Sequence, residues 1–361
     1  TEAILPLIEN AAHIAAKARN WSAAEVLFET LSSRDATKRG HWIRLAKASR
    51  DLTLQRCSKA VTPIERVPGP ILAEFHDRFA LPALPVVLTD IAHDIGSEAL
   101  TRQVMERACG RVNVNGTSLS SLLHHVLDKP DQRSDQTSSV PRLEMSLPQH
   151  CPSILETLSI PKYFANDFFQ RIPWLPEEIK ATPLVPQRTA YPTLTIDPAG
   201  TSSDLHVDFG FTHHWEVALL GSKQFKVYSS HDIPLIWPFD SSSGDSTNQE
   251  HLQDLRSCAV VFETTLSPGD TLYIPGGTPH ATVNTQSSVA LTGDFVDEFN
   301  VDAARSFGEN THESSPQRAA SLFFNHAFFD FRMHDLDSHV PWSEFSQTID
   351  EHTRAWRQRE K

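Results

Sequence analysis

The chain has 361 residues, of which 39% are hydrophobic and 21% charged, and its formal net charge is −13. A chain of this length and hydrophobic content can bury a substantial core, as one large domain or as two to three ordinary ones. The acidic balance argues against a general nucleic-acid coat protein, because contacts with phosphate groups need surplus lysine and arginine.

Membrane and disulfide-rich classes are also disfavoured. No run of about eighteen uncharged apolar residues occurs, and the first residues carry charges without a cleavage pattern, so we expect neither a membrane span nor a signal peptide. The cysteines are far apart without a CxxC pair, which indicates neither a zinc knuckle nor a disulfide scaffold. They are Cys57, Cys109, Cys151 and Cys258. A reducing compartment, the cytoplasm and/or the nucleus, is the expected location.

Residues 1–60 are predicted to form a helical N-terminal domain. Apolar residues return at helical spacing in two patterns, Trp21–Leu31 and Trp42–Ala46, with the polar turn SSRDATKRG between them. This segment holds 10 basic and 6 acidic residues, whereas the rest of the chain has a net charge of −17. Its positive surface is a possible docking face, although a solvated helix surface is the commoner case.

Residues 61–300 are predicted to form a mainly β domain. The segments PRLEMSL, YPTLTIDPAG, WEVALLGSKQFKVYSS, VVFETTLSPGDTLYIPGG and SSVALTGDFV read as strands separated by Gly/Pro turns. Such a run of antiparallel strands predicts a double-sheet jelly roll. The polar stretches 129–139 and 232–256 are predicted to be loops, and the first of them to be mobile.

Residues 301–361 are predicted to be helical again, from the patterns RAASLFFNHAFFDFRM and PWSEFSQTIDEHTRAWRQ. The first pattern has more aromatic surface than one packed face needs, with phenylalanines at positions 323, 324, 328, 329 and 331. This C-terminal region is therefore a possible dimerisation element, and packing against the chain's own β domain is the alternative.

Three residues are candidate metal ligands. In LHVDFG, His206 and Asp208 share one face of a predicted strand, either as a structural pair or as two ligands. A Gly-Gly bend precedes His280, which could then meet them. Two histidines and one carboxylate are the facial triad of non-haem Fe(II) oxygenases, and no fourth ligand of a closed zinc site is evident. His213 and His214 are adjacent, so at most one can face inward, and we expect both to be structural or at the surface.

A candidate anion-binding residue lies in GSKQFKVYSS. Strand alternation puts Lys223, Phe225 and Val227 on the face that a sheet interior accepts, and Lys226 on the exposed face. An inward lysine without a partner is costly, so Lys223 implies an anion such as 2-oxoglutarate. A register slip of one residue would exchange the roles of the two lysines.

These motifs together resemble the JmjC family of Fe(II)/2-oxoglutarate oxygenases, and within it the small phosphatidylserine-receptor-like protein hydroxylases. The resemblance rests on GTSSDLHVDFGFTHHWEVALLGSKQFKVY and LSPGDTLYIPGGTPHATVNTQSSVALTGDFV, covers about residues 64–300 and includes IPKYFANDFFQRI at 160–172. HxD followed by PGGxxH is specific in combination, whereas either half alone is weak. The resemblance implies a cupin-like JmjC jelly roll, a double-stranded β-helix, as the catalytic domain.

The resemblance also implies roles for individual residues. The Fe(II) ligands correspond to His206, Asp208 and His280, and the 2-oxoglutarate lysine corresponds to Lys223. The remaining cosubstrate positions correspond to Ser203, Thr292 and Asn284.

Two positions depart from the family pattern. Glu216 stands where the subgroup tends to have asparagine, and a carboxylate there would repel 2-oxoglutarate unless it points away or pairs with a cation. The tyrosine that many relatives supply from an earlier strand has no evident counterpart, because Leu143 and Met145 stand near its place.

The function implied by the resemblance is hydroxylation of a protein side chain with release of succinate and CO2. The alternatives are N-methyl demethylation, hydroxylation of RNA, a non-catalytic cupin-type binding module, and a metal-dependent cupin enzyme without 2-oxoglutarate. Hydroxylation is favoured because the chain lacks the histone-reading and zinc modules that often accompany demethylases. We expect a protein or peptide as partner, with RNA second, a homodimer through the C-terminal helices and no membrane.

Overall fold

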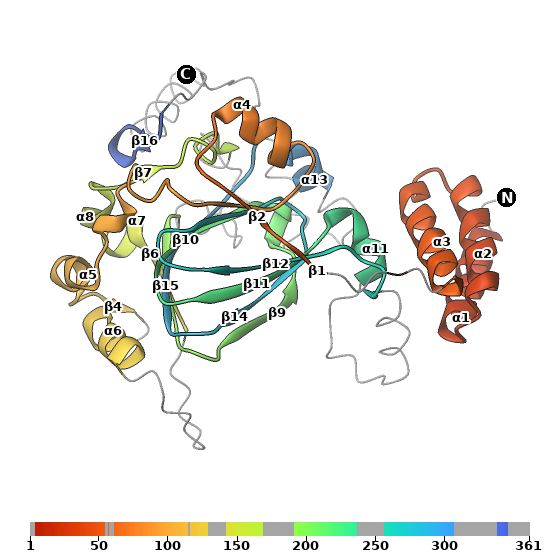
Figure 1. The fold of residues 1–361 in the computed structure, drawn as a ribbon, viewed down its shortest axis with the longest axis horizontal. Coiled ribbons are helices and arrows are strands. Elements are labelled where there is room, and N and C mark those ends of the chain that lie inside the picture. Colours follow the sequence, from red (N-terminus) through yellow and green to blue (C-terminus); the bar gives the residue numbers. More distant parts are fainter. Residues whose placement is uncertain are drawn as a thin grey trace, which may run out of the picture. The chain divides into compact units, whose positions relative to one another are not determined.

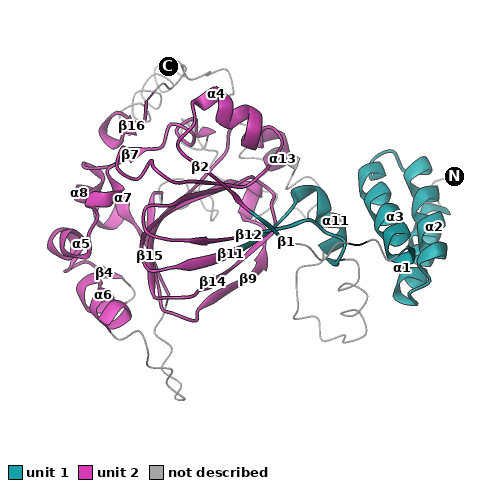
Figure 2. Cartoon of the chain, viewed as in Figure 1, with its two compact units in different colours: residues 1–63, 226–263 teal, residues 64–225, 264–361 magenta. Residues whose placement is uncertain are grey.

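A computed structural model of the chain describes residues 4–54, 57, 61–114, 116–128, 142–168, 191–236, 256–306 and 338–345. The chain divides into two compact units (Figure 2), residues 1–63 with 226–263, and residues 64–225 with 264–361. The predicted loop 129–139, most of the predicted loop 232–256 and the phenylalanine-rich C-terminal segment lie outside the described residues. Among those described, no helix is long and apolar enough to cross a membrane.

Three helices begin the smaller unit (Figure 1): α1 (Leu5–Lys17), α2 (Trp21–Arg34) and α3 (Arg39–Thr53). Asn20 caps α2, because its side chain accepts a hydrogen bond from the backbone N–H of Ala23. The buried rings of Phe28 and Trp42 stack with centroids 6.1 Å apart and hold α2 against α3. These helices agree with the predicted helical N-terminal region. The short α11 (Ile233–Ile236) belongs to the same unit.

The four cysteines form two disulfides, Cys57–Cys258 and Cys109–Cys151. The spacing of the cysteines had indicated no disulfide scaffold, and this prediction was wrong because it used only positions along the chain. The partners are 201 and 42 residues apart in sequence, yet the fold brings their Cα atoms to 4.6 and 5.8 Å, within the usual range for a disulfide. Cysteine usage therefore no longer supports a reducing compartment.

Two mixed sheets form the mainly β jelly-roll core. The smaller sheet has the order β1 (Val61–Pro63), β12 (Val261–Leu266), β11 (Lys223–Tyr228), β14 (His280–Asn284), β9 (Ser202–His206). The larger sheet has the order β2 (Glu65–Val67), β3 (Val86–Leu88), β13 (Thr271–Ile274), β10 (His213–Leu220), β15 (Ser288–Phe295), β8 (Thr193–Asp197), β6 (Leu143–Ser146). Strands that are neighbours in these sheets come from distant parts of the sequence, as a jelly roll requires.

Short helices and strands surround the sheets within the larger unit. The helices are α4 (Leu72–Phe75), α5 (Arg102–Cys109), α6 (Leu119–Asp128), α7 (Leu147–His150), α8 (Pro152–Leu155) and α13 (Val301–Ser306). The minor strands are β4 (Asn113–Val114), β5 (Thr117–Ser118), β7 (Ser159–Ile160) and β16 (Val340–Pro341). Helices α5 to α8 lie outside the larger sheet, beside β6 and β15 (Figure 1).

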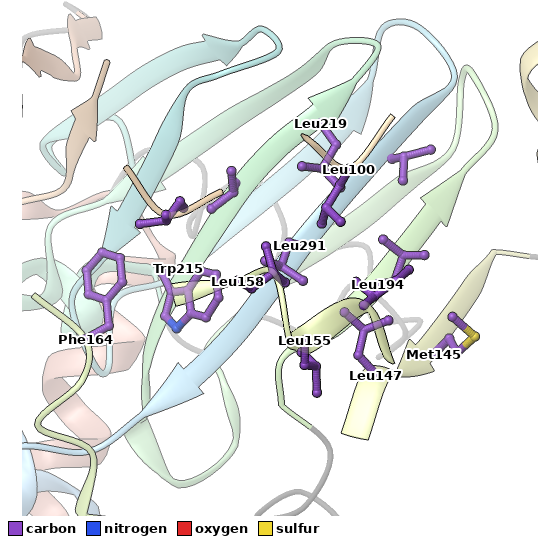
Figure 3. Close-up of a cluster of buried hydrophobic side chains, with 14 of the residues drawn as sticks. Leu100, Met145, Leu147, Leu155, Leu158, Phe164, Leu194, Trp215, Leu219 and Leu291 are labelled. Carbon is purple, nitrogen blue, oxygen red and sulfur yellow. The ribbon is translucent and has the colours of Figure 1, made fainter. Parts of the chain in front are cut away.

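The larger sheet has one apolar face and one polar face. Figure 3 shows the apolar side chains of its strands against Leu155, Leu158 and Phe164, which cover that face. The sheet contributes Met145, Leu194, Trp215, Leu219 and Leu291. Because side chains alternate along a strand, the residues between these positions point to the opposite face. That face is the polar wall on which the candidate site is built.

Candidate active site

The larger unit contains a cavity of about 520 Å³ between the polar face of the larger sheet and strands of the smaller sheet. This volume lies within the range of small-molecule sites in proteins. Its wall includes His206, Asp208 and His280, and also Lys223 and Glu216. We call the group His206, Asp208 and His280 the metal end, and the group Lys223, Glu216 and Asp197 the lysine end.

The metal end is assembled by one pair of strands. In the antiparallel pair β9 and β14, His206 lies directly opposite His280, and their ring centroids are 4.3 Å apart. Asp208 follows β9, and its carboxylate oxygens lie 3.6 Å from Nε2 of His206 and 3.8 Å from Nε2 of His280. One ligand atom from each residue lies within 4.8 Å of the others, so the group could hold a metal ion.

Backbone carbonyls orient both imidazoles. Nδ1 of His206 lies 2.7 Å from the carbonyl oxygen of Asp204, and Nδ1 of His280 lies 3.0 Å from that of Thr278. Since a carbonyl only accepts hydrogen bonds, each Nδ1 carries the proton, and the lone pair of each Nε2 is left for a metal ion. Each metal-end histidine is therefore set in its ligand tautomer by the residue two positions before it.

Electrostatics at the metal end also favour a cation. Burial is the main cause that lowers the pKa of His206, and the neighbouring His280 lowers it further. Burial and the neighbouring His214 lower the pKa of His280 to about 4, so both rings are neutral near pH 7. Burial and the nearby carboxylate of Asp294 raise the pKa of Asp208 to about 6. A divalent cation would offset this repulsion, because an opposite charge favours the ionised carboxylate.

Lys223 points into the cavity, as strand alternation predicted, but it has protein partners. Phe225 and Val227 share its buried face, and Lys226 is exposed. The ammonium Nζ lies 3.0 Å from Oε1 of Glu216 and 3.2 Å from Oδ2 of Asp197. The premise of an unpartnered lysine was wrong, because spacing along one strand cannot show which carboxylates neighbouring strands supply.

At the lysine end, Lys223 and Glu216 are held in their charged forms. Burial alone would lower the pKa of Lys223, but Glu216 and Asp197 raise it. Burial would likewise raise the pKa of Glu216, yet attraction to Lys223 and contact with His214 lower it to about 2. One buried cation therefore stands between two buried carboxylates.

Further ionic contacts extend the lysine end in both directions. Nε of Arg142 lies 3.1 Å from Oδ1 of Asp197. On the other side, Nε2 of His214 lies 3.9 Å from Oε2 of Glu216, and its Nδ1 lies 2.8 Å from Oδ1 of Asp294. Burial alone would lower the pKa of His214, but the hydrogen bond to Asp294 and the attraction of Glu216 raise it to about 10. Charges thus alternate along the polar wall.

The two adjacent histidines have different places. His213 is structural, because its Nε2 lies 3.1 Å from Oδ1 of Asp297 and its Nδ1 accepts a hydrogen bond from the N–H of Gly276. His214 lines the cavity instead. With Asp208 and Asp294 it forms a second group whose ligand atoms lie within 4.8 Å of one another, so Asp208 is shared between two groups. The expectation that both histidines are structural or at the surface was correct for the structural His213 and wrong for His214, which lines the cavity.

Two of the three remaining predicted site residues line the cavity. Oγ of Ser203 lies 2.7 Å from Oγ1 of Thr282, on the wall beside the metal end. Thr292 of β15 is directly opposite Glu216 of β10 and also faces the cavity. Both hydroxyls are therefore placed where they could contact a small ligand.

Asn284 is not among the residues that line the cavity. Its Nδ2 donates to the hydroxyl of Thr201 at 2.9 Å, and its Oδ1 accepts from the hydroxyl of Ser288 at 2.7 Å. These bonds tie together the ends of β9, β14 and β15. Because its amide is used in this way, we do not carry Asn284 into the proposed cosubstrate site.

Several cavity residues were missed from the sequence. Leu143 and Met145 belong to the hydrophobic core, and alternation along β6 sends Glu144 into the cavity instead. A tyrosine does reach the cavity, but from the segment before β8: Tyr191 donates a hydrogen bond to Asp294. The period of two within TLTID and SVALTGDF was the signal that could have identified the polar positions on β8 and β15.

The arrangement agrees with a comparison against known families. Residues 196–300 match the JmjC domain, a stretch that contains the metal end and the lysine end. Over this stretch the chain is similar to the JmjC family. The match begins in β8 and extends past β15, so it includes the strands that carry these residues.

Curated proteins similar to this chain carry names of demethylases and hydroxylases. Lysine-specific demethylase JMJ21 of Arabidopsis thaliana is 29% identical over 160 residues, 41% of this chain and 16% of that protein. The bifunctional arginine demethylase and lysyl-hydroxylase psr-1 of Caenorhabditis elegans is 22% identical over 260 residues, 64% of this chain and 61% of that protein. Arginine-specific demethylase JMJ22 of Arabidopsis thaliana is 21% identical over 251 residues, which is 66% of this chain and 47% of that protein. The chain thus spans less than two thirds of each.

Proposed function

We propose that this JmjC protein is an Fe(II)- and 2-oxoglutarate-dependent oxygenase that hydroxylates a protein side chain. The observation that supports this most strongly is the convergence of His206, Asp208 and His280, with both Nε2 lone pairs free of the backbone contacts that hold Nδ1. Two imidazoles and one carboxylate are the ligand set of non-haem Fe(II) oxygenases, which leave three coordination positions open. The donor set present therefore fits Fe(II).

The chain's own residues would bind and orient the reactants. The metal end would hold the ion, and Lys223 with the hydroxyls of Ser203 and Thr292 would hold the distal carboxylate of 2-oxoglutarate. When bound, iron and 2-oxoglutarate supply the oxidising chemistry, which yields succinate, CO2 and the oxidised substrate. The sheet walls would exclude bulk water from that chemistry.

We also propose the domain division predicted from the sequence, with a helical domain at 1–60, the JmjC catalytic domain at 61–300 and a helical region at 301–361. A homodimer through the C-terminal region stays a prediction, since its phenylalanines lie outside the described residues. Cytoplasmic and/or nuclear location also stays a prediction.

A cationic protein side chain is the proposed substrate. The cavity wall carries Glu144, Asp208, Glu216 and Asp294, and the relatives' names specify lysine and arginine. One relative is named for both demethylation and hydroxylation, so N-methyl demethylation is the second candidate for the same site. Hydroxylation of RNA is less favoured, because an acidic cavity repels phosphate.

The test is succinate formation by the full chain with Fe(II), 2-oxoglutarate and lysine- or arginine-containing peptides, methylated and unmethylated. We expect turnover that requires both iron and 2-oxoglutarate, that is lost in Asp208→Ala and that persists in Asp94→Ala, a change of an exposed carboxylate. Formaldehyde from methylated peptides would identify demethylation. Turnover without 2-oxoglutarate would indicate another cupin-type enzyme, and binding without any turnover would indicate a binding module.

A further inference from the structure

The lysine end has a property that the proposed function does not explain. Lys223 is the residue proposed to bind 2-oxoglutarate, yet Oε1 and Oε2 of Glu216 lie 3.0 and 3.1 Å from its Nζ, and Oδ2 of Asp197 lies 3.2 Å away. The side chains of these three residues are only 5%, 5% and 2% exposed. The contacts are therefore shielded from water and from salt.

Lys223 has little capacity left for a third carboxylate. An ammonium group has three N–H donors, and contacts with two carboxylates already occupy this one. The charges of Glu216 and Asp197 also exceed the charge of Lys223, so a carboxylate that approaches Nζ meets two negative neighbours there, although the cations Arg142 and His214 lie beyond them. A carboxylate of 2-oxoglutarate can bind Lys223 well only if one of the two acidic partners withdraws.

The two acidic partners are held differently. Asp197 has a second cation in direct contact, because Nε of Arg142 lies 3.1 Å from its Oδ1. Glu216 has its second cation at a longer distance, because Nε2 of His214 lies 3.9 Å from its Oε2. Glu216 also stands directly opposite Thr292, a hydroxyl proposed to contact the cosubstrate. Glu216 is thus the partner that can turn from Lys223 to His214 and that lies nearest to the proposed cosubstrate hydroxyl.

We infer that Glu216 competes with 2-oxoglutarate for Lys223 and thereby sets the affinity of the cavity for its cosubstrate. This inference rests on the proposed function and adds a specificity-determining residue to it. Cosubstrate binding requires Glu216 to exchange its contact with Lys223 for one with His214. As a consequence, turnover responds to the concentration of 2-oxoglutarate over a range in which a site with an unopposed lysine is already saturated.

The experiment measures cosubstrate binding without turnover. Full-length wild-type protein and Glu216→Gln are loaded with Mn(II), and the Kd for 2-oxoglutarate is determined by isothermal titration calorimetry. We expect the Kd to be at least about tenfold lower in Glu216→Gln, with the Kd for Mn(II) changed less than about twofold. An equal or higher Kd for 2-oxoglutarate in Glu216→Gln would overturn the inference.

Matched variants separate competition from a general charge effect. Glu65→Gln removes an exposed carboxylate that pairs with Arg78. The Kd of this variant for 2-oxoglutarate should equal that of wild type. Asp197→Asn removes the other partner of Lys223 and should change the Kd by less than about threefold. If Asp197→Asn lowers the Kd for 2-oxoglutarate as much as Glu216→Gln does, the effect comes from the total charge of the site and the inference is overturned. If Glu216→Gln does not fold, Glu216→Asp should shift the Kd in the same direction.

A different result would contradict the proposed function itself. If wild type and Glu216→Gln both bind Mn(II) but neither binds 2-oxoglutarate at millimolar concentration, the proposed cosubstrate is wrong and the inference falls with it. If both bind 2-oxoglutarate with the same Kd, the proposed function stands and only the inference falls. The two failures are therefore distinguishable in one titration series.

Discussion

At the metal end, the ligand atoms of His206 and His280 face Asp208 at 3.6 and 3.8 Å, beyond hydrogen-bond distance, while backbone carbonyls hold the opposite ring nitrogens. At the lysine end, Lys223 is in direct contact with Glu216 and Asp197 at 3.0 and 3.2 Å. A cation would complete the contacts of the ligand atoms at the metal end. At the lysine end, the charge of Lys223 is already paired with carboxylates of the protein. Metal binding should therefore depend on local geometry, and cosubstrate binding on competition with the chain's own carboxylates.

The largest effect is expected from breaking the lysine end. Lys223→Met leaves the buried carboxylates of Glu216 and Asp197 without their shared cation, so the free energy of unfolding should fall by about 3–5 kcal/mol. Urea denaturation at pH 7 measures this change. Lys226→Met, on the exposed face of the same strand, is the matched control and should change the free energy by less than about 0.5 kcal/mol. Equal stability of the two variants would show that the lysine end is not a buried ionic cluster.

Breaking the metal end should impair binding more than folding. His280→Ala removes one of three ligands. Mutating a residue that only supports a metal ligand lowers metal affinity ~10–100-fold, so the loss of a ligand itself should lower the affinity for Mn(II) by more than this. Electron paramagnetic resonance of free Mn(II) follows the binding. His93→Ala, a change of a histidine whose side chain is 82% exposed, should bind Mn(II) as wild type does. A loss below tenfold in His280→Ala would mean that the ion is bound elsewhere.

A third change perturbs the wall that both ends share. A Cβ on Gly293 would lie 2.6 Å from the indole of Trp215, and Gly293 stands between Thr292 and Asp294. We expect Gly293→Ala to reduce the free energy of unfolding by about 1–3 kcal/mol through overpacking. Thermal and urea unfolding measure the effect, and Gly40→Ala, where a Cβ meets nothing within 4 Å, is the control. Unchanged stability of Gly293→Ala would show that Trp215 can move without cost.

A further prediction is a pH dependence of stability from His214. Its pKa is raised from 6.5 to about 10, so its ionic contacts stabilise the fold fully below about pH 6.5 and are lost as the pH rises through about 10. The difference in unfolding free energy between metal-free wild type and His214→Gln should therefore be largest at pH 6 and shrink toward pH 10. Urea denaturation at pH 6, 8 and 10 measures it, and a constant difference would contradict the raised pKa.

The sequence predicted local features of the site better than its long-range contacts. The spacing of His206 and Asp208, the bend before His280 and the inward face of Lys223 all follow from the backbone geometry of single segments. The pairing of Lys223 with Glu216 does not, because it depends on how β10 and β11 of different sheets face each other. The two disulfides were missed for the same reason, since their partners meet only in the folded chain.

The prediction of a mainly β jelly roll succeeded because alternating polarity and Gly/Pro turns recur in every strand segment. The polar residues of β8 and β15 follow the same alternation, yet a buried carboxylate in a strand pattern gives no sign of its partner. Asp294, for example, is explained only by its contacts with His214 and Tyr191.

The central claim is that His206, Asp208 and His280 hold one Fe(II) beside the 2-oxoglutarate site. An anaerobic crystal structure with Fe(II) and 2-oxoglutarate tests it most directly. We predict iron bound to both Nε2 atoms and one oxygen of Asp208, with a 2-oxoglutarate carboxylate on Lys223 and Glu216 turned to His214. Iron bound instead by Asp208, His214 and Asp294, or no iron at the metal end, would contradict the account.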